Sequence, residues 1–340
     1  MPAPLVSILL PVYNAAATLP AALESLLAQT LDNFEIVAVD DGSTDSSGDL
    51  LEEWGRHDAR LRPIHEAHSG LIPALNCGLK HCRAPYIARM DADDLAHPQR
   101  LEKQVGLLEA DPELSVVGCL VETFPREAVG EGFRIYEAWL NRLARHEDIC
   151  REIFIESPIV HPSAAVRRDQ LLALGGYQER GWPEDYDLWL RYFIAGHRFA
   201  KVPEILLSWR EHPGRMTHVD GRYSVENFLR AKAHYLIQGP LKERDGLIVW
   251  GAGKTGRRLS KHLIRGGWPP AAFVDITPDK IGKTMRNIPI IGADELMSYW
   301  GKYERPLLLA AVASRGAREL IRQELARMGM VEGEDFLCAA

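Results

Sequence analysis

Short apolar runs alternate with helix-patterned segments along the first 120 residues, and this alternation restricts the chain to few folds. The first run, Leu5 to Val12, suits one buried strand, and Ala17 to Gln29 then carries leucines at helical spacing. Consecutive strand–helix units form a mostly parallel sheet with helices on both faces. We therefore predict a doubly wound α/β core. Its expected strands are 5–12, 34–39, 61–65 and 86–90, and its expected helices are 17–29, 46–57 and 70–81.

The same alternation starts again near residue 247, after a polar break. The chain has 340 residues, whereas one domain usually has roughly 100–200. The polar segment Gln238 to Gly246 contains Gly and Pro and separates two apolar regions. We therefore predict two domains, residues 1–240 and residues 241–340. Further expected strands are 163–167, 247–250, 271–274 and 307–313, and further expected helices are 187–195, 222–237 and 257–264.

The two predicted domains differ in charge. Residues 241–340 carry 16 Lys or Arg and 12 Asp or Glu, a net charge of +4. The whole chain has a net charge of −7, so residues 1–240 have a net charge of −11. Nucleic-acid binding depends on Lys and Arg contacts to phosphate, so we expect no nucleic-acid partner. If the acidic part binds a phosphate ligand, we expect a metal ion between the carboxylates and the phosphate.

Hydropathy and cysteine usage point to a cytoplasmic protein. The longest apolar run, Leu307 to Ala313, is far shorter than the roughly 20 residues of a membrane-spanning helix. The first apolar run lacks a preceding basic segment, so we expect no signal peptide and at most peripheral membrane contact. The five cysteines include no CxxC pair, which argues against a disulfide framework and against a zinc site.

Three polar clusters of the first domain fall at the ends of expected strands. Tyr13-Asn14 follows the first strand, Asp40 to Ser43 follows the second, and Asp91 to Asp94 follows the strand at 86–90. Ligands of open α/β sheets bind at this edge. Each cluster taken singly is equally explained by turn residues or helix caps. Together, closely spaced carboxylates that repel one another favour a site for Mg²⁺ or Mn²⁺ and a diphosphate.

These clusters and several later segments resemble the glycosyltransferases of family 2, which have the GT-A nucleotide-diphospho-sugar transferase fold. The resemblance covers about residues 4–215. The matching segments are Val6 to Asn14, Ser25 to Thr30, Val39 to Asp45, Ala74 to Gly78, Met90 to Asp94, His161 to Ser163, Gly175 to Tyr177 and Pro183 to Arg191. Many relatives carry Glu after Tyr-Asn, where this chain has Ala15, and this difference leaves one contact near the nucleotide open.

The resemblance implies a nucleotide-binding role for the residues that follow the first two strands. Pro11 and Tyr13 correspond to the segment that holds the nucleotide base. Asp41 corresponds to the second Asp of the family's DDGS motif, which also holds the base, and Asp40 is its neighbour. We therefore expect these four residues to bind the nucleotide of a sugar donor.

The resemblance implies a metal and diphosphate site at the third cluster. Asp91-Ala92-Asp93 occupies the DxD position, with Asp93 as the expected metal ligand and Asp91 as an expected nucleotide contact. Asp94 is expected to contact either the ribose of the nucleotide or the metal. His212 resembles a late polar segment that closes over the diphosphate, and we expect it to contribute to the metal site. A solvated loop histidine is the alternative for His212.

The resemblance also implies a catalytic base. Asp185 lies where the family keeps this carboxylate, in the pair Glu184-Asp185. Glycosyl transfer needs a base that activates the acceptor hydroxyl and a cation that stabilises the departing diphosphate. A base on the face opposite the leaving group gives inversion at the anomeric carbon. The alternative is that Asp185 caps the helix that follows.

The second domain carries a separate glycine motif. Gly251, Gly253 and Gly256 form GxGxxG between an expected strand and an expected helix, and Asp275 ends the next expected strand. This order matches the dinucleotide-binding pattern of Rossmann-like domains, with phosphates at the helix N-terminus and a ribose hydroxyl at the acid. We expect a small Rossmann-like α/β domain. Its glycines would serve either nucleotide binding or close packing in a structural module.

We predict from these features a cytoplasmic, metal-dependent, inverting glycosyltransferase. It would move a sugar from a nucleoside diphosphate donor, with UDP-sugars expected first, to a hydroxyl of a polysaccharide or lipid-linked glycan. One alternative is a non-catalytic nucleotide-binding module built on a degenerate transferase core. Another is an NAD(P)-dependent oxidoreductase centred on Gly251 to Gly256, which would leave the first 240 residues unexplained.

Overall fold

The structure is a computed structural model and describes residues 3–340. The chain forms two compact units. The first comprises Met1–Ile149, Pro158–Arg180 and Asp187–Val219, and the second comprises Cys150–Ser157, Gly181–Tyr186 and Asp220–Ala340. The second unit therefore begins at Asp220 and also takes two short earlier segments, whereas the sequence suggested one boundary near residue 240.

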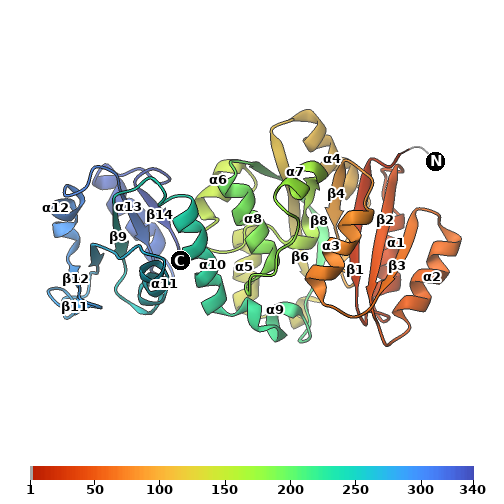
Figure 1. Cartoon of the computed structure of the whole chain (residues 1–340), viewed down its shortest axis with the longest axis horizontal. Coiled ribbons are helices and arrows are strands. Elements are labelled where there is room, and N and C mark those ends of the chain that lie inside the picture. Colours follow the sequence, from red (N-terminus) through yellow and green to blue (C-terminus); the bar gives the residue numbers. More distant parts are fainter. Residues whose placement is uncertain (1–2) are drawn as a thin grey trace. The chain divides into compact units, whose positions relative to one another are not determined.

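The first unit is built on an eight-stranded sheet (Figure 1) in the order β3-β2-β1-β4-β7-β6-β8-β5. The strands are β1 (Val6–Val12), β2 (Phe34–Asp41), β3 (Leu61–Glu66), β4 (Tyr86–Arg89), β5 (Leu95–Ala96), β6 (Leu114–Phe124), β7 (Ala165–Arg167) and β8 (Arg198–Arg210). Strands β3, β2, β1 and β4 are parallel, as are β6 and β8, while β7 and β5 run antiparallel to their neighbours. The sheet is thus mixed, with its parallel part at the N-terminal end of the chain.

Helices connect these strands. They are α1 (Leu19–Leu27), α2 (Ser47–His57), α3 (Leu71–His81), α4 (Arg100–Ala110), α5 (Glu131–Leu140), α6 (His146–Glu152), α7 (Arg168–Ala173), α8 (Glu184–Ile194) and α9 (Met216–Val219), with 3₁₀ turns η1 (Arg126–Ala128) and η2 (His161–Ser163). Helix α3 packs closely on the sheet, since a Cβ at Gly78 would lie 2.3 Å from Leu9 Cδ1. A fully buried core that includes Ile8, Leu10 and Ile36 holds these layers together.

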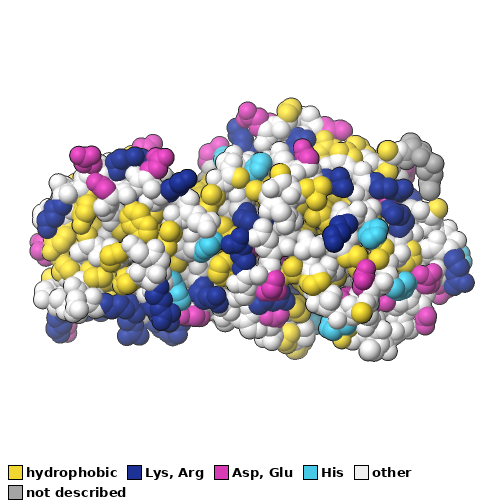
Figure 2. Space-filling model, in the orientation of Figure 1, with side chains coloured by type: hydrophobic (Ala, Val, Ile, Leu, Met, Phe, Trp, Pro, Cys, Tyr) yellow, Lys and Arg dark blue, Asp and Glu magenta, His cyan; other side chains and the backbone are white. Residues whose placement is uncertain are grey.

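The second unit contains a smaller sheet in the order β11-β12-β10-β9-β13-β14. Its strands are β9 (Gly246–Trp250), β10 (Ala272–Val274), β11 (Thr284–Met285), β12 (Ile288–Ile291), β13 (Pro306–Ala310) and β14 (Phe336–Cys338). All pairs are parallel except β11 with β12. Its helices are α10 (Val225–Gln238), α11 (Lys254–Arg265), α12 (Leu296–Trp300) and α13 (Ala317–Arg327), with η3 (Gly221–Tyr223) and η4 (Ala293–Glu295). Lys and Arg side chains gather over α11 on the face shown in Figure 2.

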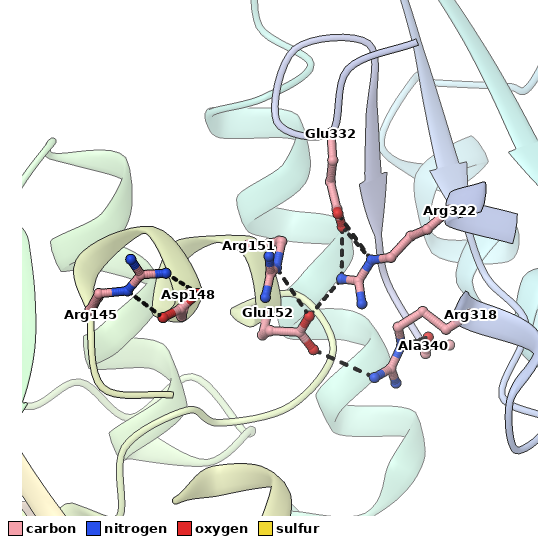
Figure 3. A network of polar contacts seen from close by, with 8 residues as sticks. All are labelled: Arg145, Asp148, Arg151, Glu152, Arg318, Arg322, Glu332 and Ala340. Atoms are coloured by element: carbon pink, nitrogen blue, oxygen red, sulfur yellow. Dashed lines mark hydrogen bonds and ion pairs between the residues drawn. The ribbon is translucent and has the colours of Figure 1, made fainter. Parts of the chain in front are cut away.

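Buried polar contacts fix the segment Cys150–Ser157 within the second unit (Figure 3). The carboxylate of Glu152 pairs with Arg318 and Arg322 of α13, at 3.5 and 2.5 Å, and Arg322 also pairs with Glu332 at 2.8 Å. Lys232 of α10 is buried and donates to the carbonyl oxygen of Ile155 at 2.6 Å. A short stretch from the middle of the sequence is therefore part of the C-terminal unit's core.

Most predicted elements are present in the structure. The longest strands that were not predicted lie in the centre of the chain. All expected strands and helices of the first 90 residues form, with ends that differ from the expected ones by at most two residues. No strand was expected at Leu114–Phe124 or Arg198–Arg210, which pair with each other as β6 and β8. Their register shifts near Cys119 and Leu120 and the exposed Ile205 interrupt the alternation that reveals a strand. Within residues 3–340, no helix has the length and apolar character needed to cross a membrane.

Candidate functional site

The carboxyl ends of β2, β1 and β4 bring together the predicted polar clusters of the first unit. These three strands are neighbours and run parallel. Tyr13 follows β1, Asp40 and Asp41 end β2, and the cluster Asp91 to Asp94 follows β4. Parallel strands with adjacent ends place these loops at one edge of the sheet, where ligands of such sheets bind.

Three carboxylates converge after β4. Asp91, Asp93 and Asp94 each offer an oxygen atom, and these atoms all lie within 4.8 Å of one another. Asp94 is buried, with 1% of its surface exposed, whereas Asp91 and Asp93 are partly exposed. The side chain of Arg89, at the end of β4, forms an ion pair with Asp91. We call Asp91, Asp93 and Asp94 the acid cluster.

The segment after β8 closes over the acid cluster. The backbone N–H of Arg210 donates to Asp94 Oδ1 at 2.7 Å, and its Nε donates to the carbonyl oxygen of Asp93 at 2.6 Å. His212 Nε2 lies 3.0 Å from Asp93 Oδ2. Residues separated by more than 115 positions in the sequence are thereby fixed next to one another. The structure therefore places His212 beside Asp93.

The electrostatics of the acid cluster are those expected of a site that could hold a cation. Burial, with repulsion from the neighbouring carboxylates, raises the pKa of Asp93 and raises that of Asp94 well above its usual range. Asp94 Oδ2 is buried and has no hydrogen-bond partner among residues 3–340. An oxygen-rich donor set with one imidazole fits Mg²⁺ or Mn²⁺, and a cation there would neutralise the repulsion. The donor set thus fits the predicted metal.

A second group of contacts anchors the segment that carries His212. Arg215 Nη1 donates to Glu211 at 2.7 Å, and His218 contacts the same carboxylate at 2.6 Å. The guanidinium of Arg215 also lies over the ring of Trp209, with 4.1 Å to the ring centroid. Burial would raise the pKa of Glu211, but the bonds from His218 and Arg215 lower it. Arg210 and Arg215 were not expected in the site, because only the fold identifies the side chains that they contact.

The predicted nucleotide residues lie in two different settings. Pro11 is buried within β1, while Tyr13 is 47% exposed and stacks on His68, with 4.1 Å between ring centroids. Asp40 and Asp41 are buried, and their carboxylates accept hydrogen bonds from neighbouring loops. The exposed aromatic pair is therefore the part of this region that is open to a ligand.

Asp185 lies in the second unit, in the first turn of α8. The helix starts at Glu184, so Asp185 is not its N-cap, and its Oδ1 accepts a hydrogen bond from the N–H of Tyr186 at 2.7 Å. Glu184 accepts a hydrogen bond from the hydroxyl of Tyr223 at 3.0 Å. The catalytic role of Asp185 stays a prediction, and the cap alternative is wrong in this structure.

The glycine motif of the second unit borders a cavity of about 820 Å³. Its lining includes Gly251, Gly253 and Asp275 at the ends of β9 and β10. Gly256 lies in α11, where an added Cβ would be 1.9 Å from the carbonyl oxygen of Gly251. Close packing thus requires Gly256, whereas an added Cβ at Gly253 meets no atom within 4 Å.

Asp275 has a structural role in this loop. Its carboxylate accepts hydrogen bonds from the backbone N–H groups of Ala252 and Thr277, each at 3.0 Å, and pairs with Lys280 at 2.9 Å. Burial would raise the pKa of Asp275, but these bonds lower it. Because Lys280 shares this carboxylate, a ribose hydroxyl would have to compete with an ion pair.

Comparison with known sequences identifies the first unit. The sequence model of glycosyl transferase family 2 matches residues 7–174. The amylovoran biosynthesis glycosyltransferase AmsE of Erwinia amylovora is 35% identical over 211 residues, which cover 60% of this chain and 75% of that protein. The putative glycosyltransferase EpsE of Bacillus subtilis (strain 168) is 32% identical over 232 residues, which cover 66% of this chain and 79% of that protein.

Comparison with solved structures agrees on the fold. S. aureus TarS residues 1–349, solved in complex with UDP-GlcNAc, superposes with a TM-score of 0.57 at 18% identity, over 76% of this chain and 72% of that chain. The mixed sheet of the first unit fits the GT-A fold. The family match over residues 7–174 includes the strand ends at which the acid cluster and Tyr13 lie. From the family match and these relatives, the chain belongs to glycosyl transferase family 2 and is a glycosyltransferase.

Proposed function

We propose that this glycosyltransferase transfers a sugar from a nucleoside diphosphate donor to a hydroxyl acceptor, with Mn²⁺ or Mg²⁺ bound at the acid cluster. The observation that carries the proposal is the convergence of three carboxylates and His212, in which buried Asp94 Oδ2 has no partner among the described residues. Uncompensated buried carboxylates are costly, and a divalent cation would compensate their charge and could in turn bind a diphosphate.

The residues around the acid cluster have separable roles in this proposal. Asp93 and His212 would hold the cation, which acts as a Lewis acid on the leaving diphosphate when bound. Arg89 orients Asp91 through their ion pair. Arg210 holds Asp93 and Asp94 through its side chain and its backbone N–H. These contacts keep the donor oxygens in place before any ligand binds, which lowers the cost of ordering them later.

Asp185 is the proposed base. A carboxylate that accepts the proton of the acceptor hydroxyl makes its oxygen a better nucleophile toward the anomeric carbon. Attack from the face opposite the diphosphate would invert the configuration of that carbon. The support is the position of Asp185 in the segment Pro183 to Arg191, which resembles the family's segment for this residue.

The proposed substrates follow from chemistry and from the named relatives. A UDP-sugar is the first donor to test, and the relative TarS was solved with UDP-GlcNAc. AmsE is named for amylovoran biosynthesis. We therefore propose a polysaccharide or a lipid-linked glycan as the acceptor, used on the cytoplasmic side with at most peripheral membrane contact.

Calorimetry with UDP, with and without Mn²⁺, tests the metal site. We expect the wild-type protein to bind UDP more tightly with Mn²⁺, and Asp93→Asn to lose this metal dependence. Glu113→Gln serves as the control, because Glu113 is an exposed carboxylate remote in sequence from the cluster. Equal UDP affinity with and without Mn²⁺ in the wild type would contradict the metal site. Titrations with GDP, CDP and dTDP then test which nucleobase the site prefers.

Substitution of the proposed base tests catalysis separately. Asp185→Asn should retain UDP binding within about twofold and reduce sugar transfer at least about 100-fold, as expected for loss of a general base. Stereochemistry of the product, measured by NMR, tests inversion. Loss of UDP binding in Asp185→Asn would assign Asp185 a structural role instead.

A second proposed activity is nucleotide binding by the Rossmann-like second unit. The cavity of about 820 Å³ beside Gly253 favours it, because a pocket of this size accommodates a nucleotide. Its lining includes Lys254 at the start of α11, and two highly exposed apolar side chains, Ile276 and Leu320, also line it. A phosphate at the helix N-terminus and a base between apolar side chains would fit this arrangement.

Gly253→Asp tests this second site. An Asp at this N-cap position is favourable for the helix and finds open space, so the variant should fold, while its charge repels phosphate. In EDTA, which removes the metal required at the acid cluster, we expect ADP, UDP or NADH to bind the wild type and to bind Gly253→Asp at least about tenfold more weakly. The neutral variant Gly253→Asn should lose less nucleotide affinity than Gly253→Asp. Failure of all three ligands to bind would assign the glycines to packing.

A further inference from the structure

His68 lies beside Tyr13 at the edge of the sheet and was not among the residues that the sequence suggested for the site. It belongs to the loop between β3 and α3, one strand beyond the loop that holds Asp41. The rings of Tyr13 and His68 are 4.1 Å apart and inclined by 19°, which is a stacked arrangement. Tyr13 is 47% exposed and the side chain of His68 is 52% exposed. The pair presents aromatic surface to solvent.

Asp41 holds His68 in this position. His68 Nδ1 lies 2.9 Å from Asp41 Oδ2 and 3.0 Å from the Asp41 carbonyl oxygen. The same carboxylate accepts hydrogen bonds from the N–H groups of Ser69 and Gly70, each at 2.8 Å. The two loops also touch through their backbones, because a Cβ at Gly42 would lie 2.6 Å from His68 N. The position of the imidazole is therefore fixed by several independent contacts.

These contacts leave Asp41 little capacity for a ligand. Its side chain is 4% exposed, and both of its oxygens accept hydrogen bonds from the loop at 68–70. The resemblance suggested that Asp41 contacts the nucleotide base directly. The geometry instead links Asp41 to the exposed aromatic surface through His68.

We infer that His68 is a positioning residue for the donor's nucleobase, an inference that rests on the proposed nucleotide-sugar donor. His68 stacks on Tyr13 and holds its ring in place, and the part of Tyr13 that stays exposed, 47% of the residue, would stack on the base. Asp41 orients His68 through Nδ1, and the amides of Ser69 and Gly70 orient Asp41. Stacking on an aromatic side chain recognises any planar base, so this platform supplies affinity for the nucleotide rather than choice of sugar.

Binding of UDP in the presence of Mn²⁺, followed by calorimetry and by the ultraviolet difference spectrum of uracil, tests this role. Base stacking lowers the absorbance of uracil, so the spectrum reports stacking and not only affinity. We expect His68→Ala to raise the Kd about tenfold and to reduce the absorbance change. His68→Phe retains a planar ring without the contact to Asp41, and it should bind within about threefold of the wild type. His57→Ala, an exposed histidine at the end of α2, is the matched control.

The outcomes separate this inference from the proposed function. Wild-type binding of UDP with unchanged affinity in His68→Ala would overturn the inference and leave the donor proposal standing. Equal losses in His68→Ala and His68→Phe, with an equal fall in Tm, would also overturn it, because they indicate a structural histidine. Absence of binding by the wild type to UDP, GDP, ADP, CDP and dTDP would overturn the donor proposal and this inference together.

Discussion

Buried carboxylates at strand ends serve two different purposes in this protein. Asp41 ends β2 and Asp275 directly follows β10. Both are almost fully buried and accept hydrogen bonds from backbone amides of loops. Asp94 is buried to the same degree, yet its Oδ2 has no partner among the described residues. Backbone amides satisfy the first two, so they stabilise loops. The unsatisfied oxygen of Asp94 instead makes the acid cluster a candidate for ligand binding.

The buried side chain of Lys201 predicts how the free energy of unfolding depends on pH. It is buried, its Nζ donates to the carbonyl oxygen of Leu140 at 2.7 Å, and burial lowers its pKa to about 7 from 10.5. Above pH 7 the unfolded chain binds a proton here that the folded protein has released, so the free energy of unfolding rises with pH. The contribution of Lys201 to this increase in the free energy of unfolding approaches about 1.4 kcal/mol per pH unit. We expect Lys201→Met to reduce the increase of the unfolding free energy between pH 7 and pH 9.

Chemical denaturation at several pH values measures this effect. Lys80→Met, at an exposed lysine of α3, should leave the pH slope of the wild type unchanged. The slope is the decisive quantity, because loss of the bond to Leu140 shifts stability equally at every pH. An unchanged slope in Lys201→Met would show that Lys201 stays protonated in the folded protein.

At the level of elements, glycines allow a helix to pack closely against the strand side of each unit. In the first unit Gly78 lets α3 approach β1, and in the second unit Gly256 lets α11 approach the turn after β9. Gly251 adopts a positive φ of 123°, which starts that turn at little cost for glycine. Two glycines of one GxGxxG motif therefore serve geometry, and only Gly253 faces open space.

Alanine substitution distinguishes these glycines. Gly256→Ala forces a methyl group toward the backbone of Gly251 and should destabilise the second unit by about 2 kcal/mol or more. Gly253→Ala has an ordinary φ of −86° and no atom near its Cβ, so we expect a change below about 1 kcal/mol. Thermal unfolding followed by circular dichroism measures both. Similar Tm values for the two variants would contradict the packing role of Gly256.

At the level of the whole molecule, the second compact unit is not one continuous stretch of the chain. The segment Cys150–Ser157 lies between β6 and β7 of the first unit in the sequence, yet it belongs to the second unit. Glu152 is 3% exposed and compensates two arginines of α13. Paired buried charges are costly to separate, so this segment ties the stability of the second unit to residues outside the C-terminal hundred.

Glu152→Gln tests this dependence. Removing the charge leaves Arg318 and Arg322 without a buried partner, and we expect a loss of about 3 kcal/mol in the stability of the second unit. Glu332→Gln is the matched control, because Glu332 pairs with Arg322 at a more exposed position, and its loss should be about 1 kcal/mol. Denaturant titration of the full chain measures both. Equal effects would show that burial does not set the strength of this network.

The local pattern of the sequence determined the elements whose contacts are close in the chain. Apolar runs and helical spacing predicted β1 to β4 and α1 to α3, because each buries one face in a simple strand–helix repeat. The motifs also predicted that Asp91 to Asp94 and Tyr13 lie at strand ends. The pairing of β6 with β8 was missed, since bulges break the alternation in these strands.

Tertiary structure alone decided the contacts between distant segments. Arg210 reaches the acid cluster across more than 115 residues, and nothing in its local sequence specifies that partner. His212 was expected near the metal site only from the family resemblance, and its contact with Asp93 depends on the fold. The stack of Tyr13 on His68 likewise depends on the order β3-β2-β1. The sequence by itself determined which residue types follow each strand, because periodicity is a local property. The partners of those side chains depended on strand order and loop packing, which are properties of the whole chain.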